Sequence, residues 1–176
     1  NPEGNSALHL AVIKGDQIAV EILLQSKAAT HLDLDALNPQ NHSALHLALK
    51  ALPNYDYFPI ITVLVNSGAN LELPNTEGDT ALLQAIRINN QELFDLVLTR
   101  QPNPANKEAQ DRQNNTALHL ALNLNKFDFA RRLIELGANL ETMSPEGDTT
   151  LLRLVRSNQT DLLVPTLERR PNFEVK

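Results

Sequence analysis

The sequence predicts an all-α fold made of five stacked copies of one helix–turn–helix repeat. Three observations carry this prediction. An apolar octapeptide recurs, as in NTALHLAL at residues 115–122, and its copies begin at positions 5, 42, 79, 115 and 148. A Ser or Thr stands before each apolar segment, and Gly or Asn recurs at fixed offsets around it. Neighbouring copies are therefore 37, 37, 36 and 33 residues apart, which is typical of a repeat array.

The first helix of each repeat is predicted to begin just after the Ser or Thr. This hydroxyl can accept a hydrogen bond from a free backbone N–H of the first helical turn. Gly and Asn adopt positive φ at the lowest cost, so we expect a turn before each helix and a left-handed residue after it. The N-cap residues are Ser6, Ser43, Thr80, Thr116 and Thr149. The left-handed residues are Gly4, Asn41, Gly78, Asn114 and Gly147 before the helices, and Gly15, Asn89, Asn125 and Asn158 after them.

A second apolar helix follows in each repeat, as in IAVEILL at 18–24 and FARRLIEL at 129–136. Pro59 suits the first turn of such a helix, whereas Pro165 falls deeper in the last one and should distort it. One repeat cannot bury both of its helices, so the five are expected to form a single array. The array lacks polar capping repeats and is expected to be a segment of a longer protein. The approximate repeat boundaries are 1–37, 38–74, 75–110, 111–143 and 144–176.

The octapeptide resembles the T-P-L-H-x-A motif of ankyrin repeats. The segment LIELGANLE at 133–141 resembles the end of that family's second helix. The resemblance covers the whole chain and implies an ankyrin-repeat solenoid whose helix–turn–helix units are joined by β-hairpin-like loops. The chain departs from the motif where Ala, or Thr in the last repeat, replaces Pro, and where Leu83 and Leu152 replace His.

The bulk composition excludes several classes of function. The net charge is −6 and no block of basic residues occurs, which argues against binding to a phosphate backbone. The chain has no cysteine and no apolar run approaching the roughly 20 residues that a membrane span needs. We therefore expect no nucleic-acid partner, no direct membrane insertion and a cytoplasmic location, with other parts of the protein recruiting it to an endosomal or other membrane. We also expect a monomeric segment.

Three histidines are the only residues that suggest catalysis or metal binding. His9, His46 and His119 each stand three positions after an N-cap. Stacked helices would space them by roughly 10 Å, too far apart to share a metal ion with ligands at about 2 Å. The family resemblance implies instead that they tie the hairpin loops. The sequence also has no HExxH, phosphate-binding glycine loop or nucleophile elbow, so we expect no enzyme activity, cofactor or metal.

The family resemblance further implies a partner-binding groove. Ankyrin proteins bind partners through the hairpin tips and the exposed side of the first helices. Here the tips would form an acidic or amide rim, and the helices a basic, partly apolar floor. The tip residues are Glu3, Asn5, Gln40, His42, Glu77, Asp79, Gln113, Asn115, Glu146 and Asp148. The helix residues are Ile13, Lys14, Lys50, Ala51, Arg87, Ile88, Asn123, Leu124, Arg156 and Ser157.

An insertion at 51–59, ALPNYDYFP, is a second candidate site. It holds both tyrosines of the chain, Tyr55 and Tyr57, beside Phe58. Exposed tyrosines often act as interface anchors. The alternative is that one or more of these rings fold back beneath the second helix of the same repeat. The sequence leaves both interpretations open.

The sequence thus predicts a protein–protein interaction module, a scaffold or adaptor that binds a partner protein or peptide through the concave groove and the hairpin tips. One alternative is the targeting arm of a larger enzyme or bacterial effector. Another is an IκB-like inhibitor, because NTALHLALNLNKFDF at 115–129 resembles units of that family. A further alternative is an endosomal membrane-traffic adaptor.

Overall fold

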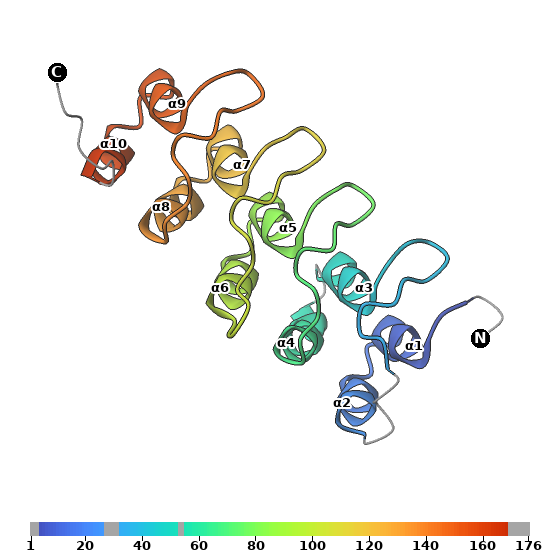
Figure 1. Ribbon diagram of the computed structural model, residues 1–176. Helices are drawn as coiled ribbons and strands as arrows, with labels where there is room; N and C mark the ends of the chain where they lie inside the picture. Colours follow the sequence, from blue (N-terminus) through green and yellow to red (C-terminus); the bar gives the residue numbers. More distant parts are fainter. Residues whose placement is uncertain (1–3, 27–31, 53–54, 169–176) are drawn as a thin grey trace. The chain divides into compact units, whose positions relative to one another are not determined.

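The computed structural model describes residues 4–26, 32–52 and 55–168 (Figure 1). This part of the chain contains ten α-helices and one short 3-10 helix, and no strand within it is assigned. The first helices of the repeats are α1 (Ala7–Ile13), α3 (Ala44–Ala51), α5 (Ala81–Arg87), α7 (Ala117–Asn123) and α9 (Thr150–Arg156). The second helices are α2 (Gln17–Gln25), α4 (Phe58–Asn66), α6 (Gln91–Thr99), α8 (Phe127–Glu135) and α10 (Thr160–Glu168), and the 3-10 helix is Tyr55–Tyr57.

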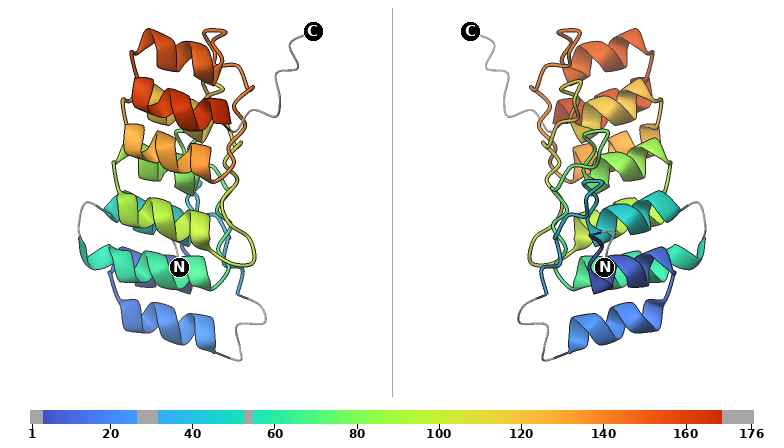
Figure 2. Two further views of the ribbon diagram at one scale, coloured as in Figure 1. Left: turned by 90° about the vertical axis from the view of Figure 1, so that its left-hand side faces the viewer. Right: turned by 90° about the vertical axis from the view of Figure 1, so that its right-hand side faces the viewer.

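The chain forms two compact parts, the first made of residues 1–81 and 96–105, the second of 82–95 and 106–176. In the first part α1 packs on α2 and α3, and α4 packs on α2 and α3. In the second part α7 packs on α8 and α9, and α10 packs on α8 and α9. Figure 2 shows α8 and α10 side by side. Within each part, first helices thus pack on first helices and second on second, as the repeat pattern predicts.

The predicted N-caps are confirmed for four of the five first helices. The Ser6 hydroxyl accepts a hydrogen bond from the backbone N–H of His9 at 3.3 Å, and Ser43 does the same with His46. Thr116 and Thr149 cap α7 and α9 in the same way. Thr80 is the exception, because its buried hydroxyl has no hydrogen-bond partner in the described structure.

The left-handed turns are confirmed at every predicted position. The nine residues have φ between 55° and 90°. After α7, the Asn125 N–H donates to the Leu122 carbonyl at 3.2 Å, and the Lys126 N–H donates to the Ala121 carbonyl at 2.8 Å. This pair of bonds is a Schellman motif, which satisfies the last carbonyls of a helix. The same pair closes α1, α5 and α9.

The two prolines of the second helices behave differently from one another. Pro59 lies in the first turn of α4, where its missing N–H has no intrahelical partner to lose. Pro165 lies inside α10, yet the helix continues through it to Glu168. The expected distortion therefore does not end the helix, and the Thr166 hydroxyl donates to the Leu162 carbonyl at 2.6 Å in the same turn.

Apolar side chains between the helices form the core. Leu8 and Leu118, which hold the same place in their octapeptides, are almost fully buried. In the second part the rings of Phe94 and Phe129 meet edge to face, with centroids 4.6 Å apart. None of the helices in the described ranges has the length and apolar character needed to cross a membrane.

Candidate functional site

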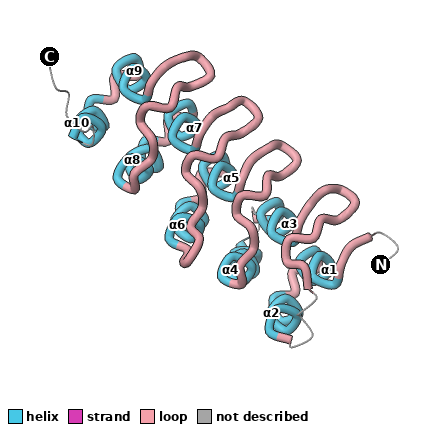
Figure 3. Tube along the Cα trace, in the orientation of Figure 1, coloured by secondary structure: helices cyan, strands magenta, loops and turns pink. Residues whose placement is uncertain are grey.

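A tight turn forms the tip of each long loop that precedes a first helix (Figure 3). At the second repeat, the Asn38 N–H donates to the His42 carbonyl at 2.9 Å. The Asn38 side-chain oxygen accepts the N–H groups of Gln40 and His42, both at 3.0 Å. Short polar side chains favour such turns because they bond the backbone two and four residues ahead. The tip is therefore held in shape by its own first residue.

A short polar side chain also shapes the turn in each of the later tips. Asn75 and Asp111 accept the corresponding pairs of backbone N–H groups, and Ser144 accepts the N–H of Asp148 at 3.2 Å. The octapeptide pattern does not include these residues. The signal was available, since a short polar residue stands five positions before each N-cap. These turn formers are Asn38, Asn75, Asp111 and Ser144.

The motif histidines connect three of the first helices, α1, α3 and α7, to the loops that follow them. His9 Nδ1 accepts the backbone N–H of Ser6 at 3.2 Å, so its proton is on Nε2, which lies 3.0 Å from the His42 carbonyl oxygen. The Nε2 atoms of His46 and His119 lie 3.0 Å from the carbonyl oxygens of Leu73 and Thr142. The resemblance assigned these histidines to loop anchoring, and the geometry agrees.

Burial lowers the pKa of two of the histidines. The pKa of His119 lies below its ordinary value of 6.5 chiefly because burial penalises the charged ring, an effect that the bond to the Thr142 carbonyl opposes. The pKa of His42 is lowered by burial and then by the nearby positive charge of Lys50. Across residues 4–26, 32–52 and 55–168, no group of three or more acidic or histidine side chains is arranged to hold a metal ion.

The predicted tip residues divide according to their exposure. In most tips the first predicted residue is exposed, whereas the second, next to the N-cap, is drawn against the start of the helix. Asn5, for example, is buried and accepts a hydrogen bond from the Asn38 amide at 3.0 Å. The exposed tip residues are Gln40, Glu77, Gln113 and Glu146; Asn5, Asp79, Asn115 and Asp148 are buried, and His42 is half-buried. Glu3 lies outside the described residues.

The predicted floor is exposed, but its charge is partly neutralised. Arg87 is ion-paired with the fully buried Asp111 at 2.7 Å, and Arg156 is ion-paired with Asp148. A glutamate in place of Arg87 would therefore face a buried carboxylate, so this position is unsuited to a charge-reversal test of binding. Ile13, Lys14, Lys50, Ile88, Leu124 and Arg156 are exposed, and Ala51, Asn123 and Ser157 are half-buried.

The tyrosine insertion is partly settled by the structure. The Tyr57 hydroxyl donates to the Ile13 carbonyl at 3.2 Å. A Cβ atom at Gly15 would lie 3.4 Å from that hydroxyl oxygen, so the glycine leaves room for the ring. The Tyr57 hydroxyl therefore reaches the end of α1 in the preceding repeat, a contact that neither interpretation of the sequence predicted. The side chain of Tyr55 lies outside the described structure.

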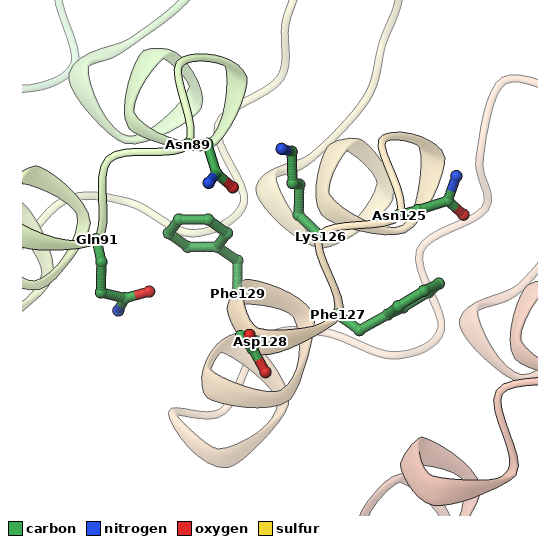
Figure 4. Close-up of a pocket in the computed structure, with 7 residues that line it drawn as sticks. All are labelled: Asn89, Gln91, Asn125, Lys126, Phe127, Asp128 and Phe129. Atoms are coloured by element: carbon green, nitrogen blue, oxygen red, sulfur yellow. The ribbon is translucent and has the colours of Figure 1, made fainter.

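Two of the recesses lined by described residues lie in the second compact part. The larger has a volume of about 510 Å³ and lies around the short turns that follow α5 and α7 (Figure 4). Its lining residues are Asn89, Gln91, Asn125, Lys126, Phe127, Asp128 and Phe129. The smaller, of about 350 Å³, is lined by Leu122, Asn123, Asn125, Glu146, Asp148, Arg153, Arg156 and Ser157. Neither recess could be predicted from the sequence, because each is lined by residues of consecutive repeats.

Comparison with known families decides the family. Residues 1–75 and 49–144 match the family model described as "Ankyrin repeats (3 copies)". The chain belongs to the ankyrin repeat family. The ankyrin repeat fold is a protein–protein interaction fold and is typically a non-catalytic binding module. The histidine ties and the tip turns are therefore the scaffold of an ankyrin array.

Individual relatives agree with this family assignment. The chain is 28% identical over 144 residues to the ankyrin repeat protein OPG189 of Variola virus, covering 73% of the chain and 25% of that protein. It is 27% identical over 163 residues to the B-cell lymphoma 3 protein of Homo sapiens, covering 91% and 35%. An intracellular phospholipase A2 of Caenorhabditis elegans is 30% identical over 145 residues, covering 77% and 13%. The chain thus spans about a third or less of each of these relatives.

A solved structure agrees with the ankyrin fold. The crystal structure of the ankyrin repeat domain of Bcl-3, described as a unique member of the IkappaB protein family, superimposes with a TM-score of 0.73 at 25% identity. The match covers 99% of this chain and 75% of that domain. The helical order of the chain is therefore that of an ankyrin solenoid.

Proposed function

We propose that this ankyrin array is a scaffold or adaptor module that binds a partner protein or peptide through the hairpin tips and the exposed side of the first helices. The supporting observation is an exposed aliphatic side chain at the end of three first helices. Ile13, Ile88 and Leu124 are 49%, 43% and 40% exposed. Single exposed aliphatic residues are ordinary, but here they recur on the helix ends, and Ile13 and Ile88 stand beside the exposed Lys14 and Arg87. A partner that covers them would remove apolar surface from water.

Two lysines offer the cleanest test of this surface. Lys14 and Lys50 are exposed at the ends of α1 and α3, and no ion pair holds either of them in the described structure. The variant Lys14→Glu with Lys50→Glu should weaken binding to a partner identified by affinity capture. Rim charges chiefly govern association, so the loss should fall mainly on the association rate and shrink at high salt. Surface plasmon resonance with the purified partner measures both effects.

A matched control lies on a second helix. Arg131 is exposed on α8, so Arg131→Glu changes charge away from the proposed surface. It should bind the partner like the wild type. The proposal fails if the lysine variant remains folded and binds as well as the control.

The likeness to Bcl-3 supports a more specific candidate, an IκB-like inhibitor. The sequence match covers 91% of the chain, and the superposition covers 99%. If the two arrays share a binding mode, the isolated ankyrin domain of Bcl-3 should compete with this chain for an identified partner. A partner that binds both arrays at once would exclude this candidate and leave the general scaffold function intact.

A further inference from the structure

The N-cap residue of α4 crosses to the preceding repeat. Tyr57 holds this position, and its hydroxyl donates to the Ile13 carbonyl at the end of α1 at 3.2 Å. The edge of its ring lies over Gly15, where an added Cβ would come 3.4, 3.6 and 3.7 Å from the hydroxyl oxygen and two ring carbons. A tyrosine of the chain itself therefore occupies the space between the turn after α1 and the start of α4.

The corresponding space in the second compact part is open. Lys126 is the N-cap residue of α8, as Tyr57 is of α4. Asn89 follows α5 with φ of 57°, as Gly15 follows α1 with φ of 67°. Lys126 and Asn89 both line the larger recess, whose volume is about 510 Å³. The larger recess is therefore the counterpart, between the third and fourth repeats, of the space that Tyr57 occupies between the first and second.

The lining of the larger recess suits an aromatic side chain. In Figure 4 the Asn89 carboxamide, the Phe129 ring and the Lys126 ammonium point toward a common space. Lys126 is half-buried, and no ion pair holds it within the described residues. An ammonium group attracts the face of an aromatic ring, and edge-to-face contact between two rings is favourable. The Asn89 carboxamide can exchange a hydrogen bond with a phenol hydroxyl.

We propose that the larger recess binds a tyrosine side chain of a partner protein. The ring takes the place that Tyr57 occupies in the first compact part, with Lys126 at its face and its hydroxyl at the Asn89 carboxamide. Tyrosine serves as an interface anchor because it buries a large ring while its polar tip finds a hydrogen-bond partner. This inference goes beyond the proposed function, since none of the predicted tip and floor residues lines the larger recess.

An NMR titration of the wild-type chain with N-acetyl-tyrosinamide tests the larger recess directly. The backbone amide signals of Asn89, Lys126 and Phe129 should shift and saturate as the probe is added. N-acetyl-leucinamide offers apolar surface without a ring and should bind at least about tenfold more weakly, because it makes no contact of the cation–π or edge-to-face kind. Acetate, the third probe, tests whether Lys126 simply attracts an anion.

The variant Lys126→Tyr with Asn89→Gly copies the Tyr57–Gly15 arrangement into the larger recess. Glycine accepts the positive φ at position 89. The new ring should occupy the recess and raise the dissociation constant of N-acetyl-tyrosinamide about tenfold or more. Arg131→Tyr is the matched control, because it adds the same side chain at an exposed position of α8 that does not line the recess. Circular dichroism establishes that both variants are folded.

Three outcomes would overturn the inference. They are no saturable shift at the lining residues, binding of leucinamide or acetate as tight as that of tyrosinamide, and unchanged probe affinity in the folded copy variant. If the copy variant does not fold, the three probes on the wild-type chain still decide.

The lysine variant of the proposed function separates the two proposals. An identified partner can lose affinity for Lys14→Glu with Lys50→Glu while N-acetyl-tyrosinamide fails to bind the wild-type chain. That result would support the proposed function and refute the tyrosine site.

Discussion

The guanidinium of Arg87 lies 2.7 Å from the carboxylate of Asp111, whose side chain has no exposed surface. Asp111 also accepts the backbone N–H groups of Gln113 and Asn115 and so shapes the fourth tip. Uncharged Asn38 fills the equivalent place in the second tip. A carboxylate at this position adds a buried charge, and Arg87 supplies the opposite charge.

Arg87→Ala should lower the free energy of unfolding by about 1–2 kcal/mol. This figure is at the low end for a charged hydrogen bond, because Arg87 is 34% exposed and Asp111 keeps its backbone donors. Adding Asp111→Asn should recover most of the loss, since a neutral amide needs no counter-charge. Urea denaturation of the wild type, the two single variants and the double variant measures both effects. The control is Lys50→Ala at an exposed lysine, which should change the free energy of unfolding by no more than ~0.5 kcal/mol. If Arg87→Ala lowers that free energy no further than the control does, the Arg87–Asp111 ion pair does not contribute to stability.

Leu118→Ala should destabilise the array by about 2–5 kcal/mol. Leu118 is 1% exposed at the start of α7, and removing its buried methyl groups leaves a cavity between helices. Leu124→Ala is the matched control, because Leu124 is 40% exposed just beyond the other end of the same helix. Hydrogen exchange should show the loss in α8 and α9 as well as in α7, since both pack on α7. Equal denaturation midpoints for the two variants would contradict the assigned burial.

Two adjacent threonines should respond to alanine in opposite directions. Thr150 is completely buried, and its hydroxyl has no hydrogen-bond partner within the described residues. The equivalent residues in the earlier repeats are alanines, so Thr150→Ala should stabilise the chain by roughly 1 kcal/mol. Thr149 caps α9 through its hydroxyl, and Thr149→Ala should destabilise by roughly 1 kcal/mol. Thermal unfolding of both variants shows whether each substitution raises or lowers the stability. If both change it in the same direction, either the unpaired Thr150 hydroxyl or the Thr149 cap is wrongly assigned.

His119 should make the array less stable in mild acid. Its folded-state pKa lies below the ordinary 6.5, mainly because of burial, so the unfolded chain takes up protons more readily. This contribution to stability is fully present above about pH 6.5 and is lost as the pH falls through the lower, folded-state pKa. His119→Leu, which copies Leu83 of the third repeat, should show a shallower loss of stability between pH 7 and pH 5. An NMR titration that places the His119 pKa above 6.5 would contradict this prediction.

Much of the fold was readable from the sequence because each local signal is decided within a few residues. Positive φ at Asn125 follows from the residue type and its place after an apolar helix, and the Ser43 cap follows from a hydroxyl just before one. These signals depend on a single turn of backbone. Their repetition across the chain then predicts the stacked array, because one repeat alone leaves apolar faces uncovered.

The candidate site was only partly readable, because it depends on which side chains meet across repeats. Asp79 and Asp148 occupy predicted tip positions, yet both are buried, since packing draws the residue before each cap against its helix. The sequence also left two fates open for Tyr57, and only the folded chain places its hydroxyl on the Ile13 carbonyl 44 residues away.

The sequence by itself therefore determined the helices, four of the five first-helix caps, the left-handed turns and the ankyrin repeat order, because these follow from local backbone chemistry. Tertiary structure alone decided which charges are free to meet a partner. Lys50 and Arg87 hold the same place in their helices and looked equivalent in the sequence. Lys50 remains exposed without an ion pair in the described structure, whereas Arg87 neutralises Asp111, 24 residues further along. A buried carboxylate requires a counter-charge, and only packing shows which arginine supplies it.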